Sequence, residues 1–200
     1  ITCGFTATGK ASLARRLGDL TGIDVVSSDV VRKGLAGLAP SEHRFEPFRA
    51  GIYSPEFTGR TYAALLEEGR DRLRRGRPVI LDASFLRREQ RRAAIRLAGE
   101  EGAQFACLAF QASDDAVRGR LARRLREGGD PSDARWEIYA AQKRRFQRPG
   151  EVPPDRLVTV DTERPLTRKA RAVCCATCCG GSRAAATSAP SGASSSSAVI

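Results

Sequence analysis

The sequence contains no methionine, a single tryptophan and a single histidine, and only 6% of its residues are aromatic. Its one histidine, His43, cannot supply the paired ligands of a typical structural zinc site. No stretch approaches the roughly 20 apolar residues of a membrane span, and no charged-then-apolar leader begins the chain. We therefore expect a cytoplasmic protein without a membrane partner. The missing methionine predicts a fragment whose first strand has lost its beginning.

The cysteines fall into two groups. Cys3 and Cys107 lie in apolar strand-like runs, which predicts buried thiols. A metal-binding knuckle is one interpretation of the other group, but structural zinc needs two ligand pairs separated by a loop, so an incidental cluster is favoured. This second group crowds into six residues and consists of Cys174, Cys175, Cys178 and Cys179.

The composition changes near Lys169, after which alanine, serine, glycine and cysteine dominate. Such a segment cannot bury enough apolar surface to offset the entropy lost on ordering. The sequence therefore predicts one domain over residues 1–167 and a disordered tail over residues 168–200. A shift of reading frame is one hypothesis for the origin of the tail.

Arginine dominates the charge of the chain. It supplies 30 of the 34 basic residues, and the net charge is +11. A basic balance can indicate a nucleic-acid partner. The arginines are nevertheless scattered over every predicted helix, which favours a compositional bias. Nucleic acid is therefore the less favoured partner.

The N-terminal edge carries the strongest motif, G-x-x-x-x-G-K over residues 4–10. Two glycines allow backbone N–H groups to turn inward around a phosphate, and a helix beginning near Lys10 adds its positive dipole end. Lys10 would reach the β and γ phosphates of a nucleotide. The alternative is a glycine-punctuated turn with one exposed lysine. The residues predicted to hold the nucleotide are Gly4, Phe5, Thr6, Ala7, Thr8, Gly9, Lys10, Ala11 and Ser12.

One position departs from this motif. The residue after the lysine is usually Ser or Thr, whose hydroxyl ligates magnesium, but here it is Ala11. Ser12 lies one residue, about 100° of helix, out of place, so we do not expect a direct substitution. The remaining alternatives are that water completes the magnesium shell or that the site is impaired.

Apolar runs alternate with helical segments between the loop and the tail. With the stub at the N-terminus they predict five strands, each buried on both faces. This alternation predicts a parallel sheet covered by helices, with the ligand beyond the carboxyl ends of the strands. The runs are residues 1–3, 23–26, 78–81, 105–110 and 157–160.

Two helix starts can be recognised from their capping chemistry. Ser54 followed by Pro55 predicts a helix that extends to about Arg75. Asp130 followed by Pro131 predicts a second helix, which continues through Trp136, Tyr139 and Lys143.

Two of the predicted strands are followed by acidic residues. Asp29 comes after the second strand, and Arg32 lies one helical turn further on the same face. Asp29 could accept a proton from a substrate hydroxyl, with Arg32 holding the substrate or a phosphate, although Asp29 could also cap the helix. Asp82 ends the third strand in the manner of a Walker B aspartate, which orders magnesium directly or through water.

An arginine-rich segment precedes a Gly-Gly-Asp-Pro break. Arg120 and Arg124 are four residues apart and share a helix face, and the break after them is typical of a hinge. A lid that closes such arginines over the γ-phosphate would stabilise developing charge and exclude water. The alternative is a solvated arginine face.

Taken together, the motifs resemble those of the bacterial AAA-type ATP-binding proteins of the P-loop kinase group. These proteins are similar to gluconate kinases, zeta-toxin-like kinases and the kinase domain of polynucleotide kinase. The resemblance covers roughly residues 1–167. The motifs that carry it are G-F-T-A-T-G-K, S-S-D-V-V-R-K, the Y-S-P-E-F-T segment, V-I-L-D-A-S-F, R-L-A-R-R with G-G-D-P-S-D-A, and V-D-T at residues 160–162.

The resemblance implies an α/β P-loop NTPase fold: a three-layer sandwich with a five-stranded parallel sheet, a truncated first strand and a helical lid. It implies ATP on the loop of residues 4–10, Asp161 near the adenine, and magnesium assisted by Asp82. In this group, Lys10, Asp29, Arg32, Arg120 and Arg124 are the candidate catalytic residues. Such domains are often fused to a domain that resembles an aminoglycoside phosphotransferase.

The predicted function is transfer of the γ-phosphoryl group of ATP to a hydroxyl of a small molecule, catalysed mainly by positioning and charge neutralisation. One alternative is a nucleotide-binding module without turnover, for which Ala11 is the best evidence. Another is a polynucleotide 5′-hydroxyl kinase. The acceptor pocket is expected in the variable region between Gly34 and Thr61.

Overall fold

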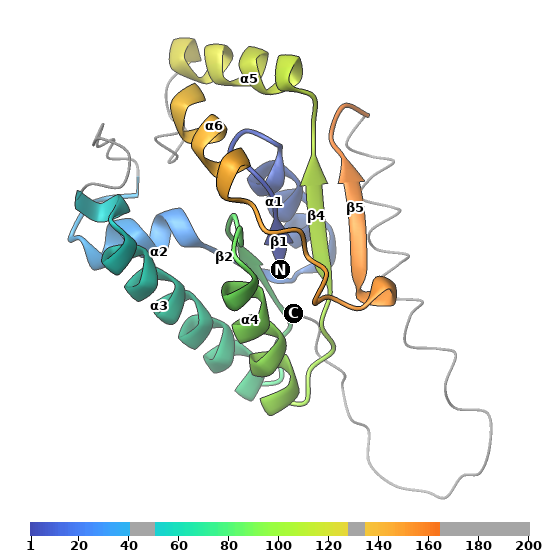
Figure 1. The fold of residues 1–200 in the computed structure, drawn as a ribbon. Coiled ribbons are helices and arrows are strands. Elements are labelled where there is room, and N and C mark those ends of the chain that lie inside the picture. Colours follow the sequence, from blue (N-terminus) through green and yellow to red (C-terminus); the bar gives the residue numbers. More distant parts are fainter. Residues whose placement is uncertain (41–50, 128–134, 165–200) are drawn as a thin grey trace, which may run out of the picture.

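The computed structural model describes residues 1–40, 51–127 and 135–164, and the account below concerns these residues (Figure 1). Predictions for the Gly-Gly-Asp-Pro break, the cysteine cluster and the tail after residue 167 lie outside them. None of the helices in the described part of the chain combines the length and the apolar character needed to cross a bilayer.

The described residues form five parallel strands, as predicted. Strand β2 pairs with β3, with Asp24 opposite Val79, while β4 pairs with β1 and β5. The strands are β1 (Thr2–Cys3), β2 (Asp24–Ser27), β3 (Val79–Asp82), β4 (Cys107–Gln111) and β5 (Leu157–Asp161).

Side-chain and backbone contacts join the two groups of strands. The Thr2 hydroxyl oxygen lies 2.9 Å from an Asp82 carboxylate oxygen and accepts the Ala83 N–H at 3.0 Å. Just beyond β1, the Gly4 N–H donates to the Ser84 carbonyl at 3.0 Å. The strands thus form a two-stranded sheet, β2-β3, and a three-stranded sheet, β1-β4-β5, and these contacts place β1 of the second sheet next to β3 of the first.

Six α-helices accompany the described strands. In Figure 1 α3 and α4 lie side by side next to β2 and β3, and α5 and α6 lie beyond the carboxyl end of β4. The helices are α1 (Lys10–Thr21), α2 (Ser28–Leu35), α3 (Pro55–Arg74), α4 (Arg88–Glu100), α5 (Asp114–Glu127) and α6 (Trp136–Arg145), with short 3-10 turns η1 (Gly51–Tyr53) and η2 (Pro154–Arg156).

Alternating side chains bury both faces of the sheet, because successive residues of a strand point to opposite sides. On one face Leu81 of β3 joins a core with Leu65 of α3 and Leu97 of α4. On the other face Leu108 of β4 packs with Leu13 of α1. Helices therefore cover both faces, which confirms the predicted three-layer α/β arrangement.

Local chemistry explains one predicted helix start. At α3 the Ser54 hydroxyl accepts the Phe57 N–H at 3.2 Å, and Pro55 occupies the first turn, as predicted. Helix α6 begins only at Trp136, because Arg135 before it is extended (φ −129°, ψ 165°). The earlier start predicted at residues 130–131 lies outside the described residues.

The two described cysteines are buried, as predicted. Cys3 in β1 and Cys107 in β4 are both 0% exposed and belong to the core beneath α3 and α4.

Candidate active site

The loop of residues 4–10 (loop 4–10) connects β1 to the first turn of α1. Gly4 and Gly9 both have positive φ angles, of 139° and 90°. A Cβ at Gly4 would lie 2.7 Å from the Phe110 carbonyl oxygen, so this position excludes a side chain. The glycines of the motif therefore stand where the backbone requires them.

Ala7 also adopts a left-handed conformation, with φ 57°. This geometry is costly for a residue with a Cβ, by about 1–2 kcal/mol. Within the described residues, Phe85 is the only other non-glycine residue with positive φ. The G-x-x-x-x-G-K motif does not predict the strain at Ala7, because residue 7 falls at one of the variable positions of the motif.

The Phe5 carbonyl organises the interior of loop 4–10. It accepts the Thr8 N–H at 3.4 Å, the Thr8 hydroxyl at 2.7 Å and the Lys10 ammonium at 2.5 Å. Burial lowers the pKa of Lys10 below its ordinary value, while Asp82 and Asp29 oppose that shift. Lys10 is thus folded over the loop and lies within electrostatic range of both acids.

A cavity of about 590 Å³ lies beyond the carboxyl ends of β1, β2 and β3. This is the place predicted for a ligand of a parallel sheet. The predicted site residues that line it are Thr6, Ala7, Gly9, Lys10, Ala11, Asp29, Arg32, Asp82 and Arg124. The predicted site residues that do not reach its lining are Gly4, Phe5, Thr8, Ser12, Arg120 and Asp161.

The two candidate acids enter the cavity from neighbouring strands. Asp29 lies in the first turn of α2, where the N-cap residue is Ser27, so Asp29 does not occupy the capping position. Asp82 ends β3 and is only 7% exposed. Burial raises the pKa of the Asp82 carboxyl, and Lys10 and the Thr2 hydroxyl oppose the shift. A cation beside Asp82 would therefore relieve an electrostatic cost.

Arg32 contributes a buried guanidinium to the cavity wall and is 7% exposed. Its Nη1 donates to the Ile52 carbonyl at 2.5 Å and to the Thr58 hydroxyl at 3.3 Å, and the group lies 5.0 Å from the centre of the Tyr53 ring. Its Nε is buried without a hydrogen-bond partner. One N–H donor of this guanidinium is therefore unsatisfied beside the cavity.

The two predicted lid arginines occupy different places. Arg124 lines the cavity, whereas Arg120 binds the outer side of loop 4–10. Arg120 donates to the Ala7 carbonyl at 3.2 Å, to the Thr162 hydroxyl at 2.8 Å and to the Thr162 carbonyl at 2.6 Å. Asp161 lies at the end of β5, and one of its carboxylate oxygens accepts the Glu163 N–H at 2.9 Å.

Helix α6 supplies cavity residues that no sequence motif indicated. The Gln142 side-chain oxygen accepts the Thr6 N–H at 2.7 Å, and both Gln142 and Arg145 line the cavity. Arg87 and Gln90 line it from the loop after β3 and the start of α4. The only sequence pattern that could have indicated the residues of α6 is their spacing. Ile138, Gln142 and Arg145 are four and three residues apart, which places them on one face of a helix.

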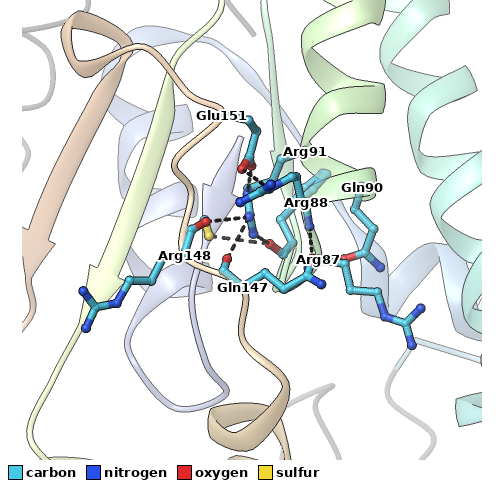
Figure 2. A network of polar contacts seen from close by, with 9 residues as sticks. Arg87, Arg88, Gln90, Arg91, Gln147, Arg148 and Glu151 are labelled. Atoms are coloured by element: carbon cyan, nitrogen blue, oxygen red, sulfur yellow. Dashed lines mark hydrogen bonds and ion pairs between the residues drawn. The ribbon is translucent and has the colours of Figure 1, made fainter.

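A buried arginine joins the β3–α4 connection to the segment after α6. Arg91 is 0% exposed, and its guanidinium forms an ion pair with Glu151. It also donates to the Phe85 carbonyl at 2.6 Å and to the Gln147 carbonyl at 2.7 Å. Figure 2 shows Arg91 between Glu151 and the chain at Gln147 and Arg148. This network anchors the segment after α6 against the cavity wall that contains Arg87.

Residues 1–149 match the model of an AAA domain family, and the chain belongs to that family. An uncharacterized protein of Mycobacterium tuberculosis is 32% identical over 138 residues, which is 69% of this chain and 27% of that protein. An uncharacterized protein of Mycobacterium bovis matches equally. The chain thus spans about a quarter of the length of the curated relatives it matches.

Solved kinase structures share the fold. A gluconokinase of Sinorhizobium meliloti is 20% identical with a TM-score of 0.61, covering 88% of this chain and 89% of that one. A sugar kinase of a Janibacter species is 19% identical with a TM-score of 0.64, covering 86% and 90%. An APS kinase of Mycobacterium tuberculosis, solved with AMPPNP and APS, is 20% identical with a TM-score of 0.63, covering 88% and 94%. The chain therefore has a P-loop kinase-like fold.

Proposed function

We propose that the protein transfers the γ-phosphoryl group of ATP to a hydroxyl of a small-molecule acceptor. The observation that carries this proposal is the single cavity that brings Lys10, Asp29, Asp82 and Arg124 together beyond the strand ends. Lys10 and Arg124 would neutralise charge on the phosphates, and Asp29 would accept the proton of the acceptor hydroxyl. The kinase structures that share the fold support a reaction of this type.

The residues around Asp82 fit a magnesium ion that also contacts the nucleotide. Within the described residues no group of three or more acidic, histidine or cysteine side chains could hold a metal by itself. Asp82 offers a buried carboxylate whose pKa is raised by burial, so a nearby cation would stabilise its charged form. Magnesium typically binds one or two carboxylates, water and substrate phosphates, and it would neutralise phosphate charge here.

Arg32 is the candidate contact for the acceptor. Arg32 lines the cavity together with other residues of α2 and α3, and its Nε is buried without a hydrogen-bond partner. An oxygen atom of the acceptor would satisfy this donor and fix the acceptor beside Asp29, one turn earlier on α2. Orientation of this kind is a main source of catalysis in phosphoryl transfer.

A second candidate function is nucleotide binding without transfer. Ala11 lines the cavity at the position where a hydroxyl would contact magnesium, and Ser12 beside it is exposed and outside the lining. Ser12 therefore does not replace the missing hydroxyl. A polynucleotide 5′-hydroxyl acceptor is a further alternative that shares Asp29 and Arg32 with the small-molecule reaction.

An acceptor screen tests these functions. The protein is incubated with ATP, magnesium and a panel of polyols, sugar acids, nucleosides and 5′-hydroxyl oligonucleotides, and ADP formation is measured. We expect acceptor-dependent ADP formation, which Lys10→Ala or Asp29→Asn abolishes. Matched controls are Lys143→Ala and Asp24→Asn, whose side chains form ion pairs with Asp114 and Arg77 away from the cavity lining.

The outcomes separate the candidates. ATP binding without transfer to any acceptor contradicts the kinase proposal and supports the binding module. Phosphate on oligonucleotide ends, with steep salt sensitivity, supports the polynucleotide acceptor.

We further propose that the protein is cytoplasmic and that a fused or separate phosphotransferase-like domain is its partner. Limited proteolysis and purification of the protein from its natural source would test that association.

A further inference from the structure

Two side chains from helices α5 and α6 contact the backbone of loop 4–10 next to Ala7. Gln142 of α6 accepts the Thr6 N–H at 2.7 Å, and Arg120 of α5 donates to the Ala7 carbonyl at 3.2 Å. We propose that Gln142 and Arg120 are positioning residues that keep Ala7 in its left-handed conformation and thereby set the affinity for the β and γ phosphates of the nucleotide. This inference rests on the proposed function, because it requires that loop 4–10 binds a nucleotide.

Ala7 needs such support because its conformation is unfavourable in isolation. Its φ of 57° costs an L-residue roughly 1–2 kcal/mol, a cost that glycine does not have. The two side chains act on both sides of this residue, one on the N–H of the preceding residue and one on the carbonyl of Ala7 itself. Strained backbone conformations persist only where the surroundings fix them.

Apolar packing from the same two helices supports the same residue. Ala7 is 4% exposed and packs in a cluster with Val117 and Leu121 of α5 and Tyr139 of α6. The neighbouring Phe5 ring meets the Tyr139 ring edge-on, with centroids 5.5 Å apart. Loop 4–10 is therefore packed directly against α5 and α6.

The consequence for binding follows from the direction of the backbone N–H groups. Successive backbone N–H groups can converge on an anion where right-handed and left-handed residues alternate. If Ala7 adopted a negative φ, the peptide after it would rotate, and the backbone N–H groups of loop 4–10 would no longer converge on the phosphates. Loss of either side chain should therefore weaken binding of phosphates in particular.

The decisive variant is Gln142→Met, which keeps the volume of the side chain but removes the acceptor for the Thr6 N–H. We expect ATP to bind about tenfold more weakly, as measured by isothermal titration calorimetry. Inorganic triphosphate, which contacts only the phosphate cradle, should show the same fold-loss when it competes with ATP. Gln104→Met, at a half-buried glutamine outside the cavity lining, is the matched control and should bind ATP like the wild type.

A second substitution tests whether the effect acts through Ala7. Glycine adopts positive φ without strain, so Ala7→Gly in the Gln142→Met background should restore ATP affinity to within about threefold of the wild type. A glutamine that merely stabilises α6 would show no such rescue. Arg120→Met should give the same loss and the same rescue, and thermal unfolding of each variant checks that it is folded.

The possible results distinguish this inference from the proposed function. Wild-type protein that does not bind ATP overturns both. Wild-type binding with unchanged affinity in Gln142→Met and Arg120→Met overturns only the positioning role. A loss that Ala7→Gly fails to rescue overturns the assignment to Ala7.

Discussion

Replacing Arg91 of α4 by methionine should strongly destabilise the protein. Arg91→Met keeps an unbranched apolar chain but removes the guanidinium that contacts Glu151 and the Phe85 and Gln147 carbonyls. Both side chains of the pair are buried, since Arg91 is 0% and Glu151 is 6% exposed. The substitution therefore leaves a buried carboxylate and backbone acceptors without their main donor (Figure 2).

The expected cost follows from this loss of partners. Removing one member of a buried ion pair destabilises proteins by about 3–5 kcal/mol, out of a total stability of about 5–15 kcal/mol. For a chain of this length, this corresponds to a melting temperature lower by roughly 6–20 °C. Phe85 adds to the cost, because its strained φ of 42° is fixed in part by the contact of its carbonyl with Arg91.

Urea denaturation followed by circular dichroism measures this difference. Arg92→Met is the matched control, because Arg92 is the next residue of α4 and is exposed, and it should change stability by less than about 0.5 kcal/mol. Adding Glu151→Met to Arg91→Met should recover part of the loss, with a coupling energy of about 1–3 kcal/mol. Equal stability of Arg91→Met and Arg92→Met would refute the reasoning.

Three further predictions address the loop, the acid and the missing hydroxyl. Gly4→Ala should lower the unfolding free energy by about 2 kcal/mol or more, since its Cβ would lie 2.7 Å from the Phe110 oxygen, whereas Gly99→Ala on α4 should be neutral or stabilising in the same denaturation assay. Burial raises the pKa of Glu151, but the hydrogen bond from Arg91, a backbone hydrogen bond and the charges of Arg91 and Arg88 together lower it below its ordinary value. The stabilisation by Glu151 is therefore present above the unfolded pKa of about 4.3 and is lost as pH falls through the lower folded value. The stability difference between wild type and Glu151→Gln should therefore shrink in urea titrations below about pH 4. Ala11→Ser should strengthen the magnesium dependence of ATP binding by about tenfold in calorimetric titrations, and identical magnesium curves would contradict a ligand position at residue 11.

Local patterns were sufficient to predict the sheet and the loop. The apolar run that ends in Asp82 predicted β3, because a strand buried on both faces is apolar at successive positions. Gly4 and Gly9 could be read from the motif because each carries its own backbone requirement. Ser54 and Pro55 likewise define the start of α3 by short-range chemistry.

The contacts that brace the site were not predictable in the same way. Thr6 and Gln142 are 136 positions apart, and neither residue type signals the other. The spacing of Arg120 and Arg124 predicted that both face the phosphates, but Arg120 donates to the Ala7 carbonyl and the Thr162 hydroxyl. Such contacts depend on how α5 and α6 pack on the loop, which a single sequence does not encode locally.

The position of Ala11 separates binding from transfer in the proposed reaction. Loop 4–10 holds its shape through Gly4, the Phe5 carbonyl and the contacts of Arg120 and Gln142, and none of these contacts involves residue 11. A missing hydroxyl at residue 11 therefore leaves the phosphate cradle intact and affects only the surroundings of the metal ion. Because residue 11 takes part in none of the loop contacts but stands where a hydroxyl would contact magnesium, the transfer rate should depend on residue 11 far more than the shape of the loop does. Activity of the natural Ala11 protein and of Ala11→Ser, compared at matched ATP occupancy, measures that dependence directly.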